Sequence, residues 1–127
     1  MKLDLDQIDL VVSDMEATVA FYRALGVDIP ESALWRTPTG VHHVDFKLPG
    51  GLQIHFDSVK LAGVYYRGWK KPTGTGTRIV LTFHVPARED VDRIHGKLTG
   101  LGHRSSQPPF DAFWGARYAI VEDPDGT

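Results

Sequence analysis

The sequence predicts an α+β fold made of two tandem β-α-β-β-β modules, and two observations carry this prediction. First, an alternating strand pattern followed by an amphipathic helix and a Leu-Gly stop occurs twice, about 75 residues apart, which indicates an internal duplication. Second, each helix is followed by short strand-like runs separated by tight-turn sequences. The 127 residues suffice for one domain, 1–127, that contains both modules.

The first module opens with a strand and a helix. Apolar side chains alternate over residues 8–12 with the period of two of a half-buried strand. The stretch 13–16 (Ser-Asp-Met-Glu) fits a capping box in which Ser13 caps the helix. Gly26 ends the helix, whose apolar stripe is Met15, Val19, Tyr22 and Leu25. Strands are expected at about 32–37, 41–48 and 52–57.

The second module repeats this order. Alternation over 79–85 predicts its first strand, and Pro86 suits the start of a helix. The apolar stripe of that helix is Val91, Ile94, Leu98 and Leu101. Further strands are expected at about 103–108 and 115–122, before an Asp-Pro-Asp-Gly turn. A last strand should follow this turn, so the second module lacks it here, and we expect the natural protein to continue for several residues.

The modules are therefore expected at 1–60 and 78–127, with 61–77 as a connecting segment. The Gly-Thr-Gly-Thr of this segment lacks the spacing of a phosphate-binding loop, and a flexible linker is the interpretation adopted.

Composition excludes several kinds of site. The chain has no cysteine, which excludes disulfides, thiolate metal ligands and a cysteine nucleophile. Its formal net charge is −2, with charges of both signs spread along the chain, so it has no basic patch of the kind that binds nucleic acid. It has no apolar run of membrane-spanning length and no signal peptide, so a cytoplasmic protein without a membrane partner is expected.

Two stretches resemble a known superfamily. Residues 8–26, IDLVVSDMEATVAFYRALG, look like the opening of a vicinal oxygen chelate (VOC) module, and 114–127, WGARYAIVEDPDGT, are similar to its closing segment. This superfamily includes glyoxalase I, bleomycin-resistance proteins, extradiol dioxygenases, methylmalonyl-CoA epimerase and fosfomycin-resistance enzymes. The resemblance implies curled mixed sheets around a shared cavity, helices on the outer faces, and a homodimer.

The resemblance also implies where a metal would bind, because metal-using members place one ligand on the first and one on the last strand of each module. Counting along the motifs puts these positions on Gln7, Gln53 and Val80, with the fourth beyond Thr127. Two amides and a valine form a poor site for Mg, Zn, Ni or Fe, which normally have an anionic or imidazole ligand. The sequence therefore predicts that the usual metal of the superfamily is absent.

Strand alternation predicts which side chains face the cavity instead. If the apolar residues of each strand pack under the helices, the residues that alternate with them face the cavity and form a polar wall. Asp45 and Asp57 are expected on this wall too, and aromatic residues lie on nearby loops. The ligand-binding residues expected are Asp9, Trp35, His43, Gln53, His55, Trp69, Thr82, His84 and Trp114.

Simpler interpretations stand beside these. Each tryptophan could be a core or dimer-interface residue, and each histidine a structural one. Asp9 needs a partner or solvent because a mid-strand carboxylate is costly to bury, and Arg117 is one candidate partner. Asp9, His55 and His84 could alternatively form a displaced metal site.

The favoured function is a metal-free, bleomycin-resistance-like protein that binds a small aromatic or hydrophobic molecule to sequester it, with no catalytic residue assigned. The alternative is a metal-dependent lyase, isomerase or dioxygenase using Zn, Ni, Mn or Fe. Catalysis by a cavity Asp or His without metal is a third possibility.

Overall fold

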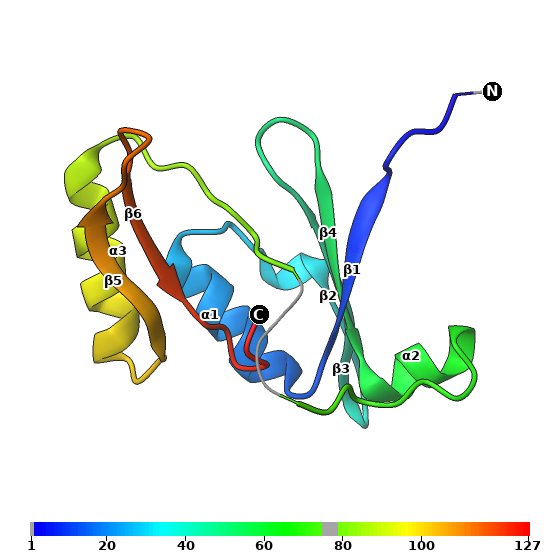
Figure 1. Cartoon of the computed structure of the whole chain (residues 1–127). Coiled ribbons are helices and arrows are strands. Elements are labelled where there is room, and N and C mark those ends of the chain that lie inside the picture. Colours follow the sequence, from blue (N-terminus) through cyan, green and yellow to red (C-terminus); the bar gives the residue numbers. More distant parts are fainter. Residues whose placement is uncertain (1, 75–78) are drawn as a thin grey trace. The chain divides into compact units, whose positions relative to one another are not determined.

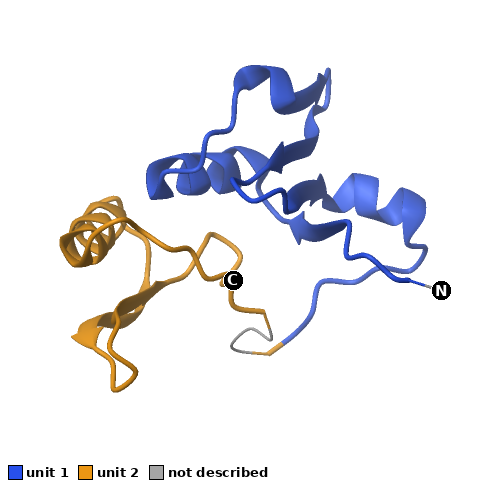
Figure 2. Ribbon diagram, turned by 90° about the horizontal axis from the view of Figure 1, so that it is seen from above, with its two compact units in different colours: residues 1–73 blue, residues 74–127 orange. Residues whose placement is uncertain are grey.

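The computed structural model describes residues 2–74 and 79–127, which fall into two compact units, Met1–Thr73 and Gly74–Thr127 (Figure 2). The first unit contains β1 (Gln7–Val12), α1 (Met15–Leu25), a 3-10 helix (Glu31–Ala33), β2 (Leu34–Thr37), β3 (Gly40–Lys47), β4 (Gln53–Ser58) and α2 (Val59–Tyr65). The second contains α3 (Arg88–Gly100), β5 (Ser105–Asp111) and β6 (Arg117–Val121) (Figure 1). The α+β class is confirmed, and every predicted strand of the first module is present within a few residues of its expected bounds.

The first unit is a complete β-α-β-β-β module. Its four strands lie in the order β1-β4-β3-β2, with β1 parallel to β4 and the other pairs antiparallel (Figure 1). One face of this sheet is apolar and packs with α1. The buried side chains of this core include Val12, Val19, Phe21, Tyr22, Val44, Phe46, Ile54 and Phe56. The predicted alternation of apolar and polar faces is therefore confirmed for these strands.

The start of α1 differs from the prediction by one residue. The N-cap is Asp14, not Ser13, and the Asp14 carboxylate accepts a 3.0 Å hydrogen bond from the backbone N–H of Ala17. Asp and Ser are equally good caps, so the sequence alone does not show which residue of the Ser-Asp pair caps the helix. The end of the helix is as predicted: Gly26 has a φ of 119°, which a residue without a Cβ adopts at little cost.

Helix α2 occupies the start of the predicted connecting segment. It follows β4 directly, and the Ser58 hydroxyl caps it by accepting a 3.1 Å hydrogen bond from Leu61 N–H. The helix contacts the sheet, and the hydroxyl of Tyr65 at its end donates a hydrogen bond to Asp57 of β4. The sequence prediction of a flexible linker missed this helix. Residues 75–78 of the Gly-Thr-rich stretch lie outside the described part of the chain.

The second unit differs more strongly from the prediction. Its strands β5 and β6 pair as an antiparallel hairpin beside α3, but residues 79–87 form neither helix nor strand. The strand predicted over 79–85 is therefore wrong for this structure. In the first unit the equivalent strand, β1, pairs only with the strand that closes the module. In the described part of the second unit, β5 and β6 pair only with each other, so residues 79–85 have no partner strand there.

None of the described helices is long and apolar enough to cross a membrane.

Candidate functional site

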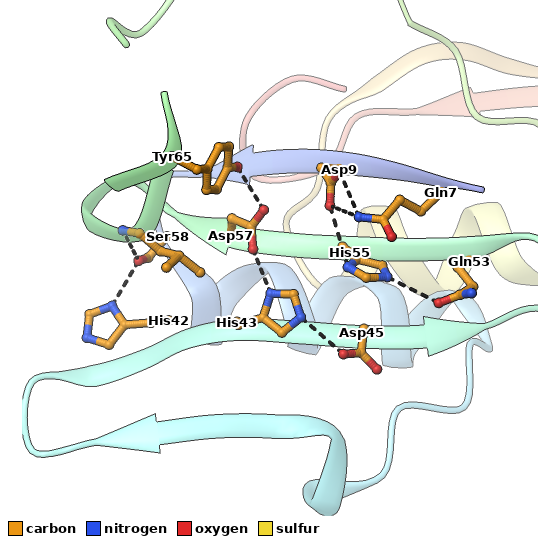
Figure 3. A network of polar contacts seen from close by, with 11 residues as sticks. Gln7, Asp9, His42, His43, Asp45, Gln53, His55, Asp57, Ser58 and Tyr65 are labelled. Atoms are coloured by element: carbon orange, nitrogen blue, oxygen red, sulfur yellow. Dashed lines mark hydrogen bonds and ion pairs between the residues drawn. The ribbon is translucent and has the colours of Figure 1, made fainter. Parts of the chain in front are cut away.

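The face of the first sheet opposite its apolar core carries polar side chains from three neighbouring strands (Figure 3). We call this the polar face. It comprises Gln7 and Asp9 of β1, His43 and Asp45 of β3, and Gln53, His55 and Asp57 of β4. Strand register brings them together: His55 lies between Asp9 on one side and Asp45 on the other, and Asp57 lies opposite His43.

One chain of hydrogen bonds on this face is centred on Asp57. The Tyr65 hydroxyl donates to Asp57 Oδ2 over 2.8 Å, and His43 Nδ1 lies 2.6 Å from Asp57 Oδ1. A carboxylate accepts only, so Nδ1 of His43 carries the hydrogen. The other ring nitrogen, Nε2, lies 3.0 Å from Asp45 Oδ2. Asp57 is 3% exposed, and its burial is tolerated because both of its oxygens have donors.

These contacts shift two pKa values. Partial burial of His43 disfavours its charged form, but the hydrogen bonds and charges of Asp57 and Asp45 outweigh this and raise its pKa. The pKa of Tyr65 is raised to about 12, first by removal of its hydroxyl from water, then by the hydrogen bond to Asp57 and the charges of Asp57 and Asp9. Tyr65 is therefore a neutral donor at physiological pH.

A second chain of contacts runs beside the first. Gln7 Nε2 donates to both carboxylate oxygens of Asp9 over 3.0 Å. Asp9 Oδ1 lies 3.5 Å from His55 Nδ1, and His55 Nε2 lies 3.3 Å from Gln53 Oε1. The rings of His43 and His55 are 5.2 Å apart, edge to face, so the two chains meet at this pair (Figure 3).

Three of these residues have the spacing of potential metal ligands. One ligand atom each of His43, Asp45 and His55 lies within 4.8 Å of the other two. Imidazole and carboxylate groups together suit Zn, Fe or Ni.

The sequence also matches the model of a known protein family. The sequence profile described as the Glyoxalase/Bleomycin resistance protein/Dioxygenase superfamily matches residues 4–127. The chain belongs to this superfamily.

Several solved structures resemble the chain over nearly its whole length. A glyoxalase/bleomycin resistance protein/dioxygenase family enzyme from Burkholderia phytofirmans PsJN is 22% identical, with a TM-score of 0.77 and coverage of 98% of this chain and 93% of that one. The hypothetical protein SA1046 from S. aureus is 22% identical, with a TM-score of 0.75 and coverage of 99% and 90%. A glyoxalase-related enzyme from Fulvimarina pelagi is 21% identical, with a TM-score of 0.75 and coverage of 97% and 82%. No curated protein matches the chain. These likenesses establish the fold of the VOC superfamily, not a reaction.

The positions where the VOC superfamily places its metal do not fit a metal in this chain. Gln7 and Gln53 are register partners on the polar face, but both offer neutral amides. Both amides are also engaged, Gln7 by Asp9 and Gln53 by His55. Val80 has no donor atom, is 59% exposed and belongs to the other unit.

The sequence-predicted site residues divide between the two units. Asp9, His43, Gln53 and His55 come together on the polar face, and Trp35 lies opposite His43 in the β2–β3 register and is half exposed. Trp69 belongs to the same unit and follows α2. The others, Thr82, His84 and Trp114, belong to the second unit, so the described geometry does not join them to this site.

Arg117, the candidate partner of Asp9, forms ion pairs within its own unit. Arg117 pairs with Asp92 at 2.8 Å and with Asp111 at 3.4 Å, both within the second unit. Tyr65, by contrast, is a member of the network that strand alternation does not predict. The signal that could have found it is Ser58, a good N-cap directly after β4, which starts a helix that ends at Tyr65.

Proposed function

We propose that this protein binds a small molecule with an aromatic or hydrophobic part at the polar face of its first sheet. The observation that supports the proposal is the pair of polar contact chains that meet at His43 and His55. Their groups are held in place by register and by the buried carboxylate of Asp57, yet the side chains of His43 and Asp9 remain 27% and 39% exposed. Pre-ordered polar groups of this kind fix the orientation of a ligand.

Exposed aromatic side chains in the same unit favour a planar or hydrophobic ligand. Trp35, Tyr65 and Tyr66 are each more than half exposed. Amphipathic aromatic rings supply contact area at a low entropic cost, while their polar tips remain hydrated. We further propose binding without chemical conversion, of the resistance or sequestration type that the name of the superfamily includes, in a cytoplasmic homodimer.

A second candidate function is a metal-dependent lyase, isomerase or dioxygenase. The cluster of His43, Asp45 and His55 favours it. A divalent ion held there would act as a Lewis acid on oxygen atoms of a substrate.

The experiment that tests binding uses the full chain after EDTA treatment and exchange into metal-free buffer. Intrinsic tryptophan fluorescence is followed against a panel of planar aromatic, glycosylated and peptidic compounds. We expect saturable quenching by at least one class, weakened about three- to tenfold by His55→Ala, as the loss of one hydrogen-bonding group predicts. Glu89→Ala, an exposed substitution in the second unit, is the control and should leave affinity unchanged. Absence of saturable quenching across all three classes would contradict the proposal.

A further inference from the structure

We propose that His43, Asp45 and His55 bind one divalent transition-metal ion, such as Zn²⁺, Ni²⁺ or Fe²⁺, on the polar face. This site differs from the superfamily positions at Gln7, Gln53 and Val80. It goes beyond the binding proposal, because the polar face can bind a small molecule with or without an ion, and it supplies the ion on which the second candidate function rests. Two imidazoles and one carboxylate form a donor set that suits these metals.

Strand register places the three side chains close together. Asp45 and His55 are direct cross-strand partners of β3 and β4, and His43 is two residues from Asp45, so all three project from the same face (Figure 3). His43 Nε2 and Asp45 Oδ2 are already 3.0 Å apart. Ligand atoms at about 2.0–2.1 Å from one ion lie roughly 3–3.5 Å from one another. All three ligand atoms lie within 4.8 Å of one another, and the Asp45 side chain, which is 58% exposed, is free of close packing that would prevent it from turning toward an ion.

The surrounding residues orient the two imidazoles as metal-binding histidines are normally oriented. Asp57 accepts from Nδ1 of His43 and so directs Nε2 toward Asp45. The Tyr65 hydroxyl donates to the second carboxylate oxygen of Asp57, Oδ2, and so keeps this carboxylate in position. A carboxylate partner behind a histidine fixes its tautomer and raises its basicity as a ligand.

His55 is supported whichever of its nitrogens coordinates the ion. If Nε2 coordinates, Nδ1 faces the Asp9 carboxylate at 3.5 Å. If Nδ1 coordinates, Nε2 keeps Gln53 Oε1 as its partner at 3.3 Å. Asp9, Asp45 and Asp57 together also give this face a negative character that favours a cation.

The site would leave coordination positions for another molecule, since three protein ligands do not complete the shell of such an ion. A ligand with oxygen or nitrogen donors would therefore bind more tightly to the loaded protein than to the EDTA-treated one. This difference separates the metal proposal from the binding proposal, which is tested on the EDTA-treated protein alone.

The test is a calorimetric titration of the untagged, EDTA-treated full chain with Zn²⁺, Ni²⁺ and Co²⁺ separately. We expect one ion per chain for at least one metal, and loss of this stoichiometric binding in His43→Ala, Asp45→Asn and His55→Ala. His42→Ala is the matched control, because His42 is the neighbouring histidine on β3 but bonds Ser58 at 2.8 Å instead of joining the cluster, and it should retain binding. Asp57→Asn should weaken binding by about 10- to 100-fold without abolishing it.

A second measurement tests the site even if a variant of one of the three metal-binding residues fails to fold. Zn²⁺ is added to the wild-type protein while the imidazole resonances of its histidines are followed by NMR. Selective shifts of His43 and His55, with His42 and His95 unchanged, support the site. Absence of stoichiometric binding by the wild type, or retained binding by folded His43→Ala and His55→Ala, would overturn the proposal, whatever the outcome of the ligand panel.

Discussion

The imidazole rings of His43 and His55 lie edge to face, 5.2 Å apart, on the neighbouring strands β3 and β4. Each ring is bonded to a different chain of partners, His43 to Asp57 and His55 to Asp9 and Gln53. Their contact therefore makes one connected polar network from residues of three strands and α2. Predictions about this network, and about the unit that supports it, follow from the contacts of individual residues.

Asp57→Asn should destabilise the protein by about 1–3 kcal/mol, because a buried carboxylate that two donors satisfy is replaced by an amide whose NH₂ cannot accept from His43 or Tyr65. Urea unfolding followed by circular dichroism measures this free energy. Asp45→Asn is the control, because the Asp45 side chain is largely exposed and its loss should cost well under about 1 kcal/mol. Equal costs for the two variants would mean that Asp57 is not the anchor of the network.

Tyr65 should titrate with a pKa of about 12, and Asp57→Asn should lower this value toward the ordinary range. The difference in phenolate absorbance between wild type and Tyr65→Phe isolates this group from the other tyrosines. Because the pKa is raised in the folded state, the stability that Tyr65 contributes is fully present below its unfolded pKa of about 10 and is lost as pH rises from there through about 12. An ordinary tyrosine pKa in the wild type would contradict the hydrogen bond to Asp57.

Phe56 anchors the apolar face that lies opposite the network. It is fully buried and stacks 5.0 Å from Tyr22 of α1, so Phe56→Ala should cost about 3–5 kcal/mol of unfolding free energy. Phe113→Ala is the matched control, because Phe113 is 97% exposed and its loss should change stability by less than about 0.5 kcal/mol. Thermal melts of both variants, converted with the measured enthalpy, check this contrast. A small effect of Phe56→Ala would show that α1 does not pack on β4 as described.

Asp14→Ala should destabilise the first unit by about 1 kcal/mol through loss of the cap on Ala17 N–H. Asp14→Ser should recover most of this loss, since serine caps a helix equally well. Chemical denaturation measures both differences. If Asp14→Ser is as damaging as Asp14→Ala, the carboxylate acts through something other than the cap.

The sequence predicts the part of the fold that depends on local periodicity. Alternation places His43, His55, Asp9 and Gln53 on one face, and the structure agrees. Their partners depend on the β1–β4 and β3–β4 registers, which join residues of separate strands, and alternation alone does not define these registers. The meeting of His43 and His55, and the spacing of Asp45 to both, could therefore not be predicted.

Two errors have a different origin. The predicted strand over 79–85 has a strand pattern, but among the described residues no strand pairs with it, and strand formation depends on pairing more than on propensity. Most of helix α2 falls in the segment interpreted as a linker between the two modules, although the Ser58 cap is a local signal for a helix.

The central claim, that the polar face of the first sheet binds a small molecule, is tested most directly by ¹⁵N-HSQC spectra of the EDTA-treated full chain. The compound added is the one from the fluorescence panel that quenches at the lowest concentration. The account predicts that the amide resonances that shift most belong to β1, β3, β4 and the end of α2, and that those of His43, His55 and Tyr65 are among them. Shifts confined to Gly74–Thr127, or spread without preference over the chain, would contradict it.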